Sequence, residues 1–447
     1  MKKYNRLSPA QIILLGFAGL ILVGAILLML PVSSQQGRWT PFLNALFTAT
    51  SAGCVTGLVV YDTAQYWSSF GQMIILFLIQ IGGMGVVTVA IAMGMLSGKK
   101  IGLKQRWIMQ ESISAPGIGG IVRLTGFVLK SVFLVEGVGA LLLAVRFCPE
   151  FGFWKGLWYS VFHSISAFCN AGFDLMGIRG TPFSSLTAYA ADPWINTVMI
   201  FLIVVSGLGF LTWHDILEYK HHVQRYRLQS KIILCTTGFL LLTSFVFFMG
   251  YEFRLPQWSG MTAAERVQAA AFQAVTPRTA GFNTVDLTAL SQPGQLITIF
   301  LMLIGGSPGS TAGGFKTTTI AVLILSIRAA LRQREHTECF GRRIPAGNVQ
   351  NAGVLFVMYL LLFLSSGVAI CCIEHIPMMD ALFETGSAVA TVGLTLGHTP
   401  NLSGISHIIL IFLMYFGRVG GLTMLYAVTI KGFATGSQYP QETVTVG

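Results

Sequence analysis

The sequence predicts an all-α membrane protein with eight transmembrane helices, arranged as four copies of one unit around a central pore with fourfold pseudo-symmetry. Two observations lead to this fold class. The first is composition: of 447 residues, 53% are hydrophobic and only 10% are charged, whereas about 25% are charged in a typical soluble domain. The second is a glycine turn that recurs four times. Each unit is expected to contain a span, a re-entrant half-helix that ends in the turn, and a second span.

The four turns are short apolar and hydroxyl-bearing runs, each built around one glycine. These are Gly57, Gly172, Gly281 and Gly393, and the differences between successive positions are 115, 109 and 112 residues. Repetition at a nearly fixed period indicates one structural unit used several times. The expected units are residues 1–98, 99–219, 220–335 and 336–430, followed by a polar tail at 431–447. We expect a cytoplasmic tail that packs at a dimer interface, with disorder as the alternative.

Eight apolar segments come near or exceed the roughly 20 residues that a helix needs to cross a bilayer. They are residues 10–30, 70–96, 124–145, 194–213, 232–250, 295–327, 349–373 and 405–430. Together with four re-entrant half-helices they account for nearly all of the chain. No soluble domain is expected.

Non-helical backbone at membrane depth is stable only where it is buried in protein or lines a water-filled cavity. Four turns that meet on one axis would line such a cavity. A ring of carbonyl oxygens can replace the hydration shell of a monovalent cation, and glycine permits backbone conformations that point carbonyls inward. The residues expected to form this ring are Cys54, Val55, Thr56, Gly57, Cys169, Asn170, Ala171, Gly172, Thr279, Ala280, Gly281, Thr391, Val392 and Gly393.

A glycine-rich run interrupts the apolar segment 295–327. Five glycines and a proline cannot continue a regular helix, so we expect a loop in the middle of the membrane. Its unpaired backbone groups need the water of a pore cavity or protein partners, and its glycines allow it to move. We therefore expect this loop to act as a gate beneath the turns. A deletion of residues 307–311 is expected to raise flux and to leave ion preference nearly unchanged, because it leaves the turns untouched. The spacing does not match a phosphate-binding loop and no strand precedes it, which argues against a nucleotide site. The expected gate residues are Gly305, Gly306, Ser307, Pro308, Gly309, Ser310, Thr311, Ala312, Gly313, Gly314, Lys316 and Arg418.

Charged and small residues inside the spans suggest further roles. Glu136 is the only carboxylate inside a predicted span, and such a residue is a functional candidate by default. We favour a structural role, with Lys130 or a nearby backbone amide as its partner. Arg418 is expected to face the pore axis or the 305–316 loop, because a buried arginine needs a partner or water. For the glycines within residues 81–85, close helix packing is a sufficient explanation.

The distribution of charge predicts the orientation. With a cytoplasmic N-terminus, 18 of the 28 Lys and Arg residues lie on inner segments, as the positive-inside rule requires. Ten of the 17 acidic residues fall on the outer side, where they would concentrate cations at the pore mouth. A basic inner face suits anionic lipid or an acidic partner. No nucleic-acid-binding motif accompanies the net charge of +11.

Two other classes of protein compete with a pore. An alternating-access secondary transporter, such as a Na+- or H+-coupled cation symporter, would also contain broken helices and buried charges. Units of two spans all share one orientation, however, which favours the pore. A membrane enzyme that uses Cys54, Cys169 or Glu136 ranks last, because no nucleophile, base and orienting group converge. No enzymatic activity is therefore expected.

These features together resemble the Trk/Ktr/HKT superfamily of potassium transporters, and most closely the bacterial Ktr-type membrane subunit. The resemblance covers essentially the whole chain. It rests on four two-span units, one glycine in each turn, the glycine-rich break in the third unit and Arg418 in the fourth. Glycine in all four turns argues against relatives that carry serine in the first and prefer sodium. A chain that begins with the first span favours Ktr over Trk.

The resemblance implies potassium uptake across a bacterial plasma membrane through a channel-like pore. Gly57, Gly172, Gly281 and Gly393 would be the glycines of a selectivity filter that binds K+ at backbone carbonyls, and residues 305–316 would be an intramembrane gating loop. It also implies a homodimer that sits on a cytoplasmic ring of nucleotide-binding regulatory subunits. Neither a covalently bound cofactor nor nucleic acid is implied. Many proteins of this kind are stimulated by Na+.

Overall fold

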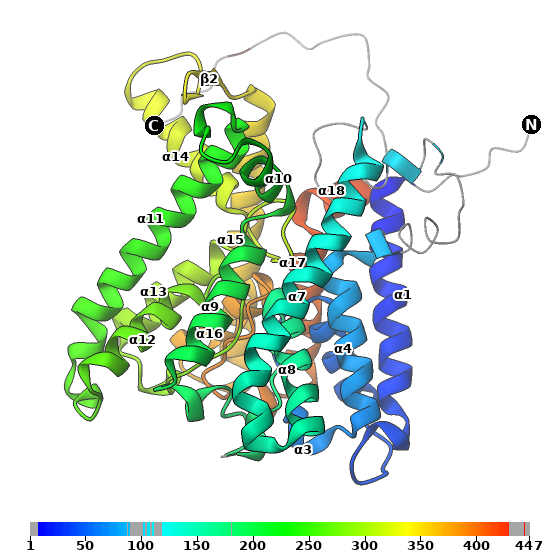
Figure 1. Cartoon of the computed structure of the whole chain (residues 1–447). Coiled ribbons are helices and arrows are strands. Elements are labelled where there is room, and N and C mark those ends of the chain that lie inside the picture. Colours follow the sequence, from blue (N-terminus) through cyan, green and yellow to red (C-terminus); the bar gives the residue numbers. More distant parts are fainter. Residues whose placement is uncertain are drawn as a thin grey trace, which may run out of the picture.

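The computed structural model describes residues 8–86, 88–89, 102, 105–107, 110, 119–179, 181–428 and 442. In this part of the chain, long helices stand side by side and shorter helices lie among them (Figure 1). The α-helices are α1 (Pro9–Met29), α2 (Phe42–Gly53), α3 (Thr63–Tyr66), α4 (Ser69–Met84), α7 (Ile121–Phe151), α8 (Phe153–Phe168), α9 (Pro193–Gly207), α10 (Phe210–Tyr219), α11 (Leu228–Gly250), α12 (Ala263–Val275), α13 (Gln292–Leu303), α14 (Thr317–Leu331), α15 (Ala346–Glu374), α16 (Met378–Val389), α17 (Gly404–Val419) and α18 (Gly421–Val428).

Short elements connect these helices. Strand β1 (Glu338–Cys339) pairs in antiparallel register with β2 (Arg342–Arg343), and this hairpin follows α14. The 3-10 turns are η1 (Pro31–Ser33), η2 (Met176–Ile178), η3 (Thr187–Tyr189), η4 (Val223–Arg225), η5 (Glu252–Arg254), η6 (Pro256–Trp258), η7 (Leu287–Ala289) and η8 (Thr399–Asn401).

Four described helices, α1, α7, α11 and α15, are long and apolar enough to cross a membrane. Two further pairs reach this length only when both helices are counted: α9 with α10, bent by 96°, and α17 with α18, bent by 94°. The described residues therefore contain four to six candidate spans, fewer than the eight predicted. Helices α4, α13 and α14 are apolar but shorter. Segment 90–96, at the end of the second predicted span, lies outside the described residues, as does the predicted dimer-interface tail except Glu442.

Three predicted spans are not continuous helices, which corrects the expectation from the sequence. Helices α4, α9 and α17 stop just before or near Gly85, Gly209 and Gly420, whose φ angles are 86°, 87° and 89°. A right-handed helix cannot continue through such an angle, and glycine adopts it without the steric cost that a Cβ brings. The apolar pattern continues across each break, so hydropathy alone predicts one straight span.

Close packing is a second role of the glycines in α4. A Cβ built on Gly82 would collide with the carbonyl oxygen of Gly53, and one on Gly83 would lie 2.6 Å from the Sγ of Cys169. Both neighbours belong to segments that lead into glycine turns. The predicted packing role is therefore present, but it is not sufficient, because the same run also ends the helix.

The four half-helices α2, α8, α12 and α16 each lead into one predicted turn. Each packs extensively against the long helix that precedes it in the chain: α1 with α2, α7 with α8, α11 with α12, and α15 with α16. In Figure 1, α8 and α12 lie in the lower half of the molecule, whereas α10, α14 and β2 lie at the top. The turns therefore lie away from the end that carries the β-hairpin.

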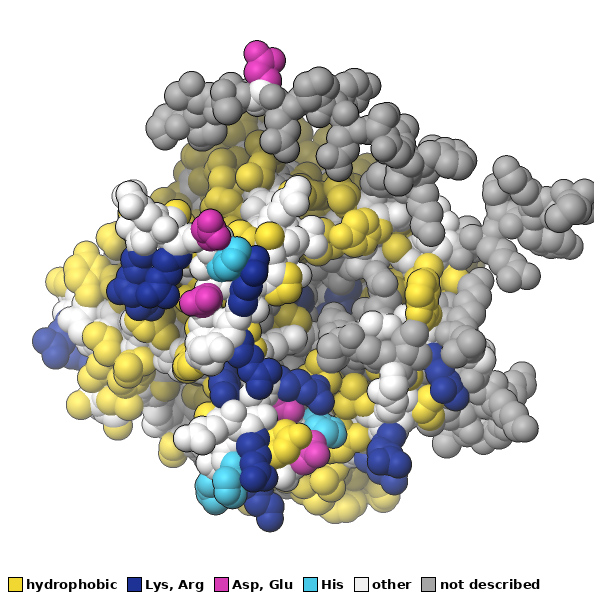
Figure 2. All heavy atoms as spheres, turned by 90° about the horizontal axis from the view of Figure 1, so that it is seen from above, with side chains coloured by type: hydrophobic (Ala, Val, Ile, Leu, Met, Phe, Trp, Pro, Cys, Tyr) yellow, Lys and Arg dark blue, Asp and Glu magenta, His cyan; other side chains and the backbone are white. Residues whose placement is uncertain are grey.

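The end of the molecule with α10, α14 and the β-hairpin is rich in basic side chains. Figure 2 views this end from above and shows Lys and Arg side chains spread over it, with few acidic ones between them. The exposed basic residues of these elements and their connections are Lys220, Arg225, Arg227, Arg328, Arg332, Arg334, Arg342 and Arg343.

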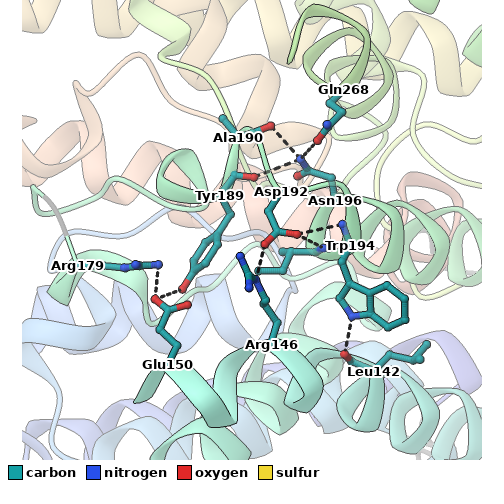
Figure 3. Close-up of polar contacts among 11 residues, drawn as sticks. Leu142, Arg146, Glu150, Arg179, Tyr189, Ala190, Asp192, Trp194, Asn196 and Gln268 are labelled. Atoms are coloured by element: carbon teal, nitrogen blue, oxygen red, sulfur yellow. Dashed lines mark hydrogen bonds and ion pairs between the residues drawn. The ribbon is translucent and has the colours of Figure 1, made fainter. Parts of the chain in front are cut away.

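At the opposite end, the segment between η2 and α9 is tied to α7 (Figure 3). Arg146 Nε donates to Asp192 Oδ2 at 2.7 Å, and the hydroxyl of Tyr189 donates to Glu150 Oε1 at 2.9 Å. Arg179 forms an ion pair with the same Glu150 carboxylate. Asp192 also caps α9, because its Oδ1 accepts from the backbone amides of residues 194 and 195 at 3.0 and 3.2 Å.

Replacing Asp192 with Ala is expected to lower the free energy of unfolding by about 1 to 2 kcal/mol, because the variant loses a helix cap worth about 1 kcal/mol as well as the ion pair. Arg146→Ala removes only the pair. Since the Arg146 side chain is 59% exposed, its loss should cost less than the loss of Asp192. Thermal unfolding in detergent measures both variants. Equal destabilisation by the two changes would show that the cap contributes nothing.

Candidate functional site

The four turns share one backbone conformation. The second residue before each glycine has a positive φ: 58° at Val55, 57° at Asn170, 70° at Thr279 and 53° at Thr391. Three of these residues are β-branched, for which a positive φ is a genuine outlier. Such strain costs on the order of 1 to 3 kcal/mol per residue and persists only where the surroundings impose it. Its recurrence at one position shows that the turn, rather than the local sequence, determines the conformation.

The four glycines form a closed ring of contacts. A Cβ built on any of them would lie within 3.0 Å of a carbonyl oxygen in the neighbouring turn. The pairs run from Gly57 to Ala171, from Gly172 to Ala280, from Gly281 to Val392 and from Gly393 back to Thr56. Each partner is the residue just before the next glycine. Only glycine fits these positions, and the four turns meet at one place.

Hydroxyl groups support the turns from behind, a feature that the sequence analysis missed. The Oγ atoms of Ser51 and Ser387 accept from the amides of Gly57 and Gly393 at 3.0 and 2.9 Å. Ser166 Oγ donates to the carbonyl of Phe173 at 2.6 Å. All three serines stand six residues before a glycine, so the sequence held a detectable signal. In the third turn, Thr276 Oγ1 donates to the carbonyl of Phe282 instead.

The C-termini of the half-helices lie beside this ring. Helices α2, α8 and α16 end four residues before the glycine of their turn, and α12 ends six residues before it. A helix C-terminus carries a partial negative charge of about half an elementary charge. Four such ends, together with the turn carbonyls, make the ring a favourable place for a cation.

A cavity of about 100 Å³ borders the ring on the side of the segments that follow the turns. All four glycines line it, together with Asp62, Asp174, Asn283 and Thr395. Burial raises the pKa of the Asp174 carboxyl to about 7, the amide of Met176 acts in the opposite direction, and the Asp62 carboxylate adds a smaller increase. This cavity therefore holds a carboxyl group whose pKa lies near neutral pH.

A second cavity, of about 200 Å³, is lined by the glycines at the helix breaks and by the 305–316 loop. Its lining includes Gly85 and Gly420 from the breaks, Gly309 and Lys316 from the loop, and Arg418 from α17. The predicted gate residues are thus partly gathered around one cavity. Within the described part of the chain, Lys316 and Arg418 are the charged residues in this lining.

The 305–316 loop connects α13 to α14 where the sequence predicts a break. Its backbone is hydrogen bonded to the broken ends of other helices: Ser307 N donates to the Gly207 carbonyl at 3.0 Å, and Phe210 N donates to the Gly309 carbonyl at 2.9 Å. Gly314 N donates to the Gly417 carbonyl at 3.1 Å. Backbone groups at membrane depth need such partners. The breaks beside α9 and α17 therefore help to satisfy the loop.

The loop also contacts the turns directly. Thr311 Oγ1 accepts from Asn170 Nδ2 at 2.9 Å and donates to the Phe168 carbonyl at 3.0 Å. A Cβ on Gly314 would lie 2.7 Å from the Ala390 carbonyl, at the start of the fourth turn. The expectation that a deletion of residues 307–311 leaves the turns untouched is therefore wrong, because it removes Thr311.

Arg418 faces the loop, as predicted. Its Nη1 donates to the Thr311 carbonyl, and its Nη2 donates to the carbonyls of Gly82 and Gly83, the latter at 3.0 Å. This guanidinium therefore joins the loop, the end of α4 and α17. Arg418 is remote in sequence from all of these partners. Hydropathy and motif spacing therefore cannot identify them from the sequence.

Glu136 has other partners than those predicted. Gln80 Nε2 donates to both of its carboxylate oxygens at 3.1 Å, and Cys169 Sγ lies 3.8 Å from Oε1. Lys130 is exposed. Six residues along an α-helix correspond to about 600° of rotation, so the two side chains of α7 project in different directions. Glu136 thus supports the second turn through Cys169.

The chain is similar in sequence to known cation transport proteins. The sequence matches the TrkH family model, described as cation transport protein, over residues 22–433. It is 41% identical to the potassium/sodium uptake protein NtpJ of Enterococcus hirae, over 99% of this chain and 98% of that protein. It is 38% identical to the Ktr system potassium uptake protein B of Bacillus subtilis, over 100% of this chain and 98% of that protein.

A solved structure shows a similar fold. The potassium transporter TrkH from Vibrio parahaemolyticus gives a TM-score of 0.72 at 20% identity, with 96% of this chain and 86% of that chain covered. The resemblance noted from the sequence is thus confirmed, and the apolar helices indicate a multi-pass membrane protein. The chain belongs to the TrkH family of cation transport proteins.

Proposed function

We propose that this protein is a potassium uptake pore and that the ring of four glycine turns is its selectivity filter. The observation that carries the proposal is the closed set of contacts in which each glycine meets a carbonyl of the next turn. Carbonyl oxygens gathered in this way can substitute for the hydration shell of K+. The relatives named above are uptake proteins for potassium, and in one case for potassium and sodium.

The pore contains four pseudo-symmetric units and eight spans. The units end near residues 98, 219, 335 and 430. In each, a half-helix packs on the preceding long helix. The second spans are α4, the bent pair α9 and α10, the interrupted pair α13 and α14, and the bent pair α17 and α18. An alternating-access symporter would instead require coupled movement of halves about the site, and the continuous ring favours a pore.

The 305–316 loop acts as the gate. It lines the second cavity and contacts the second and fourth turns, so a cation that leaves the ring meets the loop next. Lys316 and Arg418 bring positive charge to this cavity, and charges interact strongly where the dielectric constant is low. Displacement of the loop therefore lowers the barrier to permeation.

The protein lies in a bacterial plasma membrane with its N-terminus and its basic end in the cytoplasm. The positive-inside rule favours this orientation, and the basic end (Figure 2) suits anionic lipid or an acidic surface. A homodimer bound to a ring of cytoplasmic nucleotide-binding subunits is the proposed assembly, because one relative is named as a component of a Ktr system. K+ is the transported ion, Na+ a stimulating ion, and no cofactor is bound covalently.

Replacing Gly57 with Ser is expected to lower the preference for K+ over Na+ about tenfold, equivalent to about 1.4 kcal/mol. The new Cβ would press on the Ala171 carbonyl, 2.5 Å away, and Gly57 has a φ of 97°. Rubidium uptake into proteoliposomes in competition with Na+ measures the preference. Gly238→Ser on α11 is the matched control, because nothing lies within 4 Å of its Cβ position. Parent-like selectivity in the Gly57 variant would contradict the filter assignment.

Replacing Lys316 with Met is expected to raise rubidium flux about threefold or more, because the variant loses a positive charge beside the path. It also frees the loop, since Lys316 Nζ donates to the carbonyls of Ala312 and Gly313 at 2.7 and 3.1 Å. Initial uptake rates at equal protein content provide the measurement. Lys130→Met removes the same charge from the exposed face of α7. An equal rise in both variants, or no rise in the folded Lys316 variant, would exclude this gate.

Uptake should depend on external pH through Asp174. The pKa of its carboxyl is raised to about 7, so the group is mostly neutral at about pH 6 and mostly charged at about pH 8. The half-saturating rubidium concentration should therefore fall as pH rises through this range, because a charged mouth attracts cations. Asp174→Asn should remove the dependence, whereas Asp286→Asn, at an exposed acid away from the cavity lining, should retain it. A parent-like profile in the Asp174 variant would refute this role.

A further inference from the structure

The second turn differs from the others in one side chain. Asn170 stands where Val55, Thr279 and Thr391 stand in the other turns. Val55 has no polar side-chain atom, and the hydroxyls of Thr279 and Thr391 are buried without a hydrogen-bond partner in the described structure. Asn170 Nδ2 donates to Ser206 Oγ and to Thr311 Oγ1, both at 2.9 Å. Among these four equivalent residues, Asn170 thus carries a polar link to the 305–316 loop.

The orientation of this link follows from its partners. Ser206 Oγ donates its hydrogen to the Ile203 carbonyl at 3.1 Å, and Thr311 Oγ1 donates its hydrogen to the Phe168 carbonyl at 3.0 Å. Both hydroxyls have therefore used their only hydrogen. The Asn170 amide must turn its NH2 group toward them.

The Thr311 hydroxyl therefore holds the second turn at two points. It accepts from Asn170 within the turn and donates to Phe168, the last residue of α8. Ala171 follows Asn170, and its carbonyl oxygen is the atom that a Cβ on Gly57 would meet. The Thr311 hydroxyl is thus bonded to the residue that directly precedes a ring carbonyl.

Thr311 is also held from the side of the loop. Its carbonyl accepts from Arg418, whose guanidinium binds the Gly83 carbonyl as well. If the loop moved alone, the Phe168 carbonyl would lose its hydrogen bond from Thr311, and the Asn170 side chain would lose one of the two hydrogen bonds that it donates. Unpaired polar groups in a buried site are costly. Movement of Thr311 is therefore coupled to movement of the second turn.

We propose that Thr311 is a positioning residue through which the loop sets the geometry of the second turn, so that loop position controls the preference for K+ over Na+. This inference rests on the proposed filter and gate, and goes beyond them because it joins the two functions in one hydroxyl. The perturbation enters the ring at the second turn, next to the Ala171 carbonyl.

The test compares Thr311→Val with Thr311→Ser by Na+ competition against rubidium uptake in proteoliposomes. Valine has nearly the shape of threonine but neither donates nor accepts, so the preference for K+ should fall about fivefold. Serine keeps the hydroxyl and should stay within about twofold of the parent. A purely steric role of the side chain would predict the reverse order, because serine lacks the methyl group.

A second pair of variants tests the coupling. Asn170→Val, which introduces the residue found in the first turn, should also lower the preference, because it removes the bond to Thr311. The double variant should lose less than the sum of the two single losses, because both changes remove this shared bond. Additive losses would overturn the proposal, as would parent-like selectivity in Thr311→Val while Gly57→Ser loses it. If Gly57→Ser also kept the parent's selectivity, the filter assignment would be wrong and the inference would fail with it.

Discussion

The structure depends on one constraint: four backbone carbonyls must be held close together inside a membrane protein, although their dipoles repel one another. Glycine makes the approach sterically feasible, since each ring glycine lies where any Cβ would strike the neighbouring turn. The strained residues at Val55, Asn170, Thr279 and Thr391 direct the chain into that arrangement. Serine and threonine hydroxyls hold the backbone from behind. Strain of this kind persists only where packing over-determines it, and the long helices provide that packing.

The same constraint explains why several helices break. A loop at membrane depth needs hydrogen-bond partners that lipid cannot provide. The interruptions near Gly209 and Gly420 expose backbone groups at Gly207, Phe210 and Gly417, and the 305–316 loop bonds to these groups. Each helix break therefore provides hydrogen-bond partners for backbone groups that another break leaves unpaired. Arg418 joins the set through carbonyls on the loop and on α4, so the region beneath the ring behaves as one network.

The sequence predicts the glycine turns and the break at 305–316, because these features depend on composition and on spacing along the chain. It predicts neither the bends nor the partners of buried polar groups. Apolar residues continue through Gly209 and Gly420, so hydropathy predicts one straight span where the two helices are bent by more than 90°. Lys130 is near Glu136 in sequence, but the side-chain partner of Glu136 is Gln80, which lies 56 residues from it along the chain. Asn170 and Thr311 are 141 residues apart, and a single sequence contains no signal that joins them.

We propose that cations bind at the carbonyls of Thr56, Ala171, Ala280 and Val392. Anomalous diffraction from crystals grown in rubidium salts tests this claim most directly, because it locates the ion without relying on transport. Anomalous density is expected within the ring of four turns, and weaker density there when Na+ replaces most of the rubidium. Rubidium density elsewhere in the molecule, with none at the ring, would show that the ring is not the cation site.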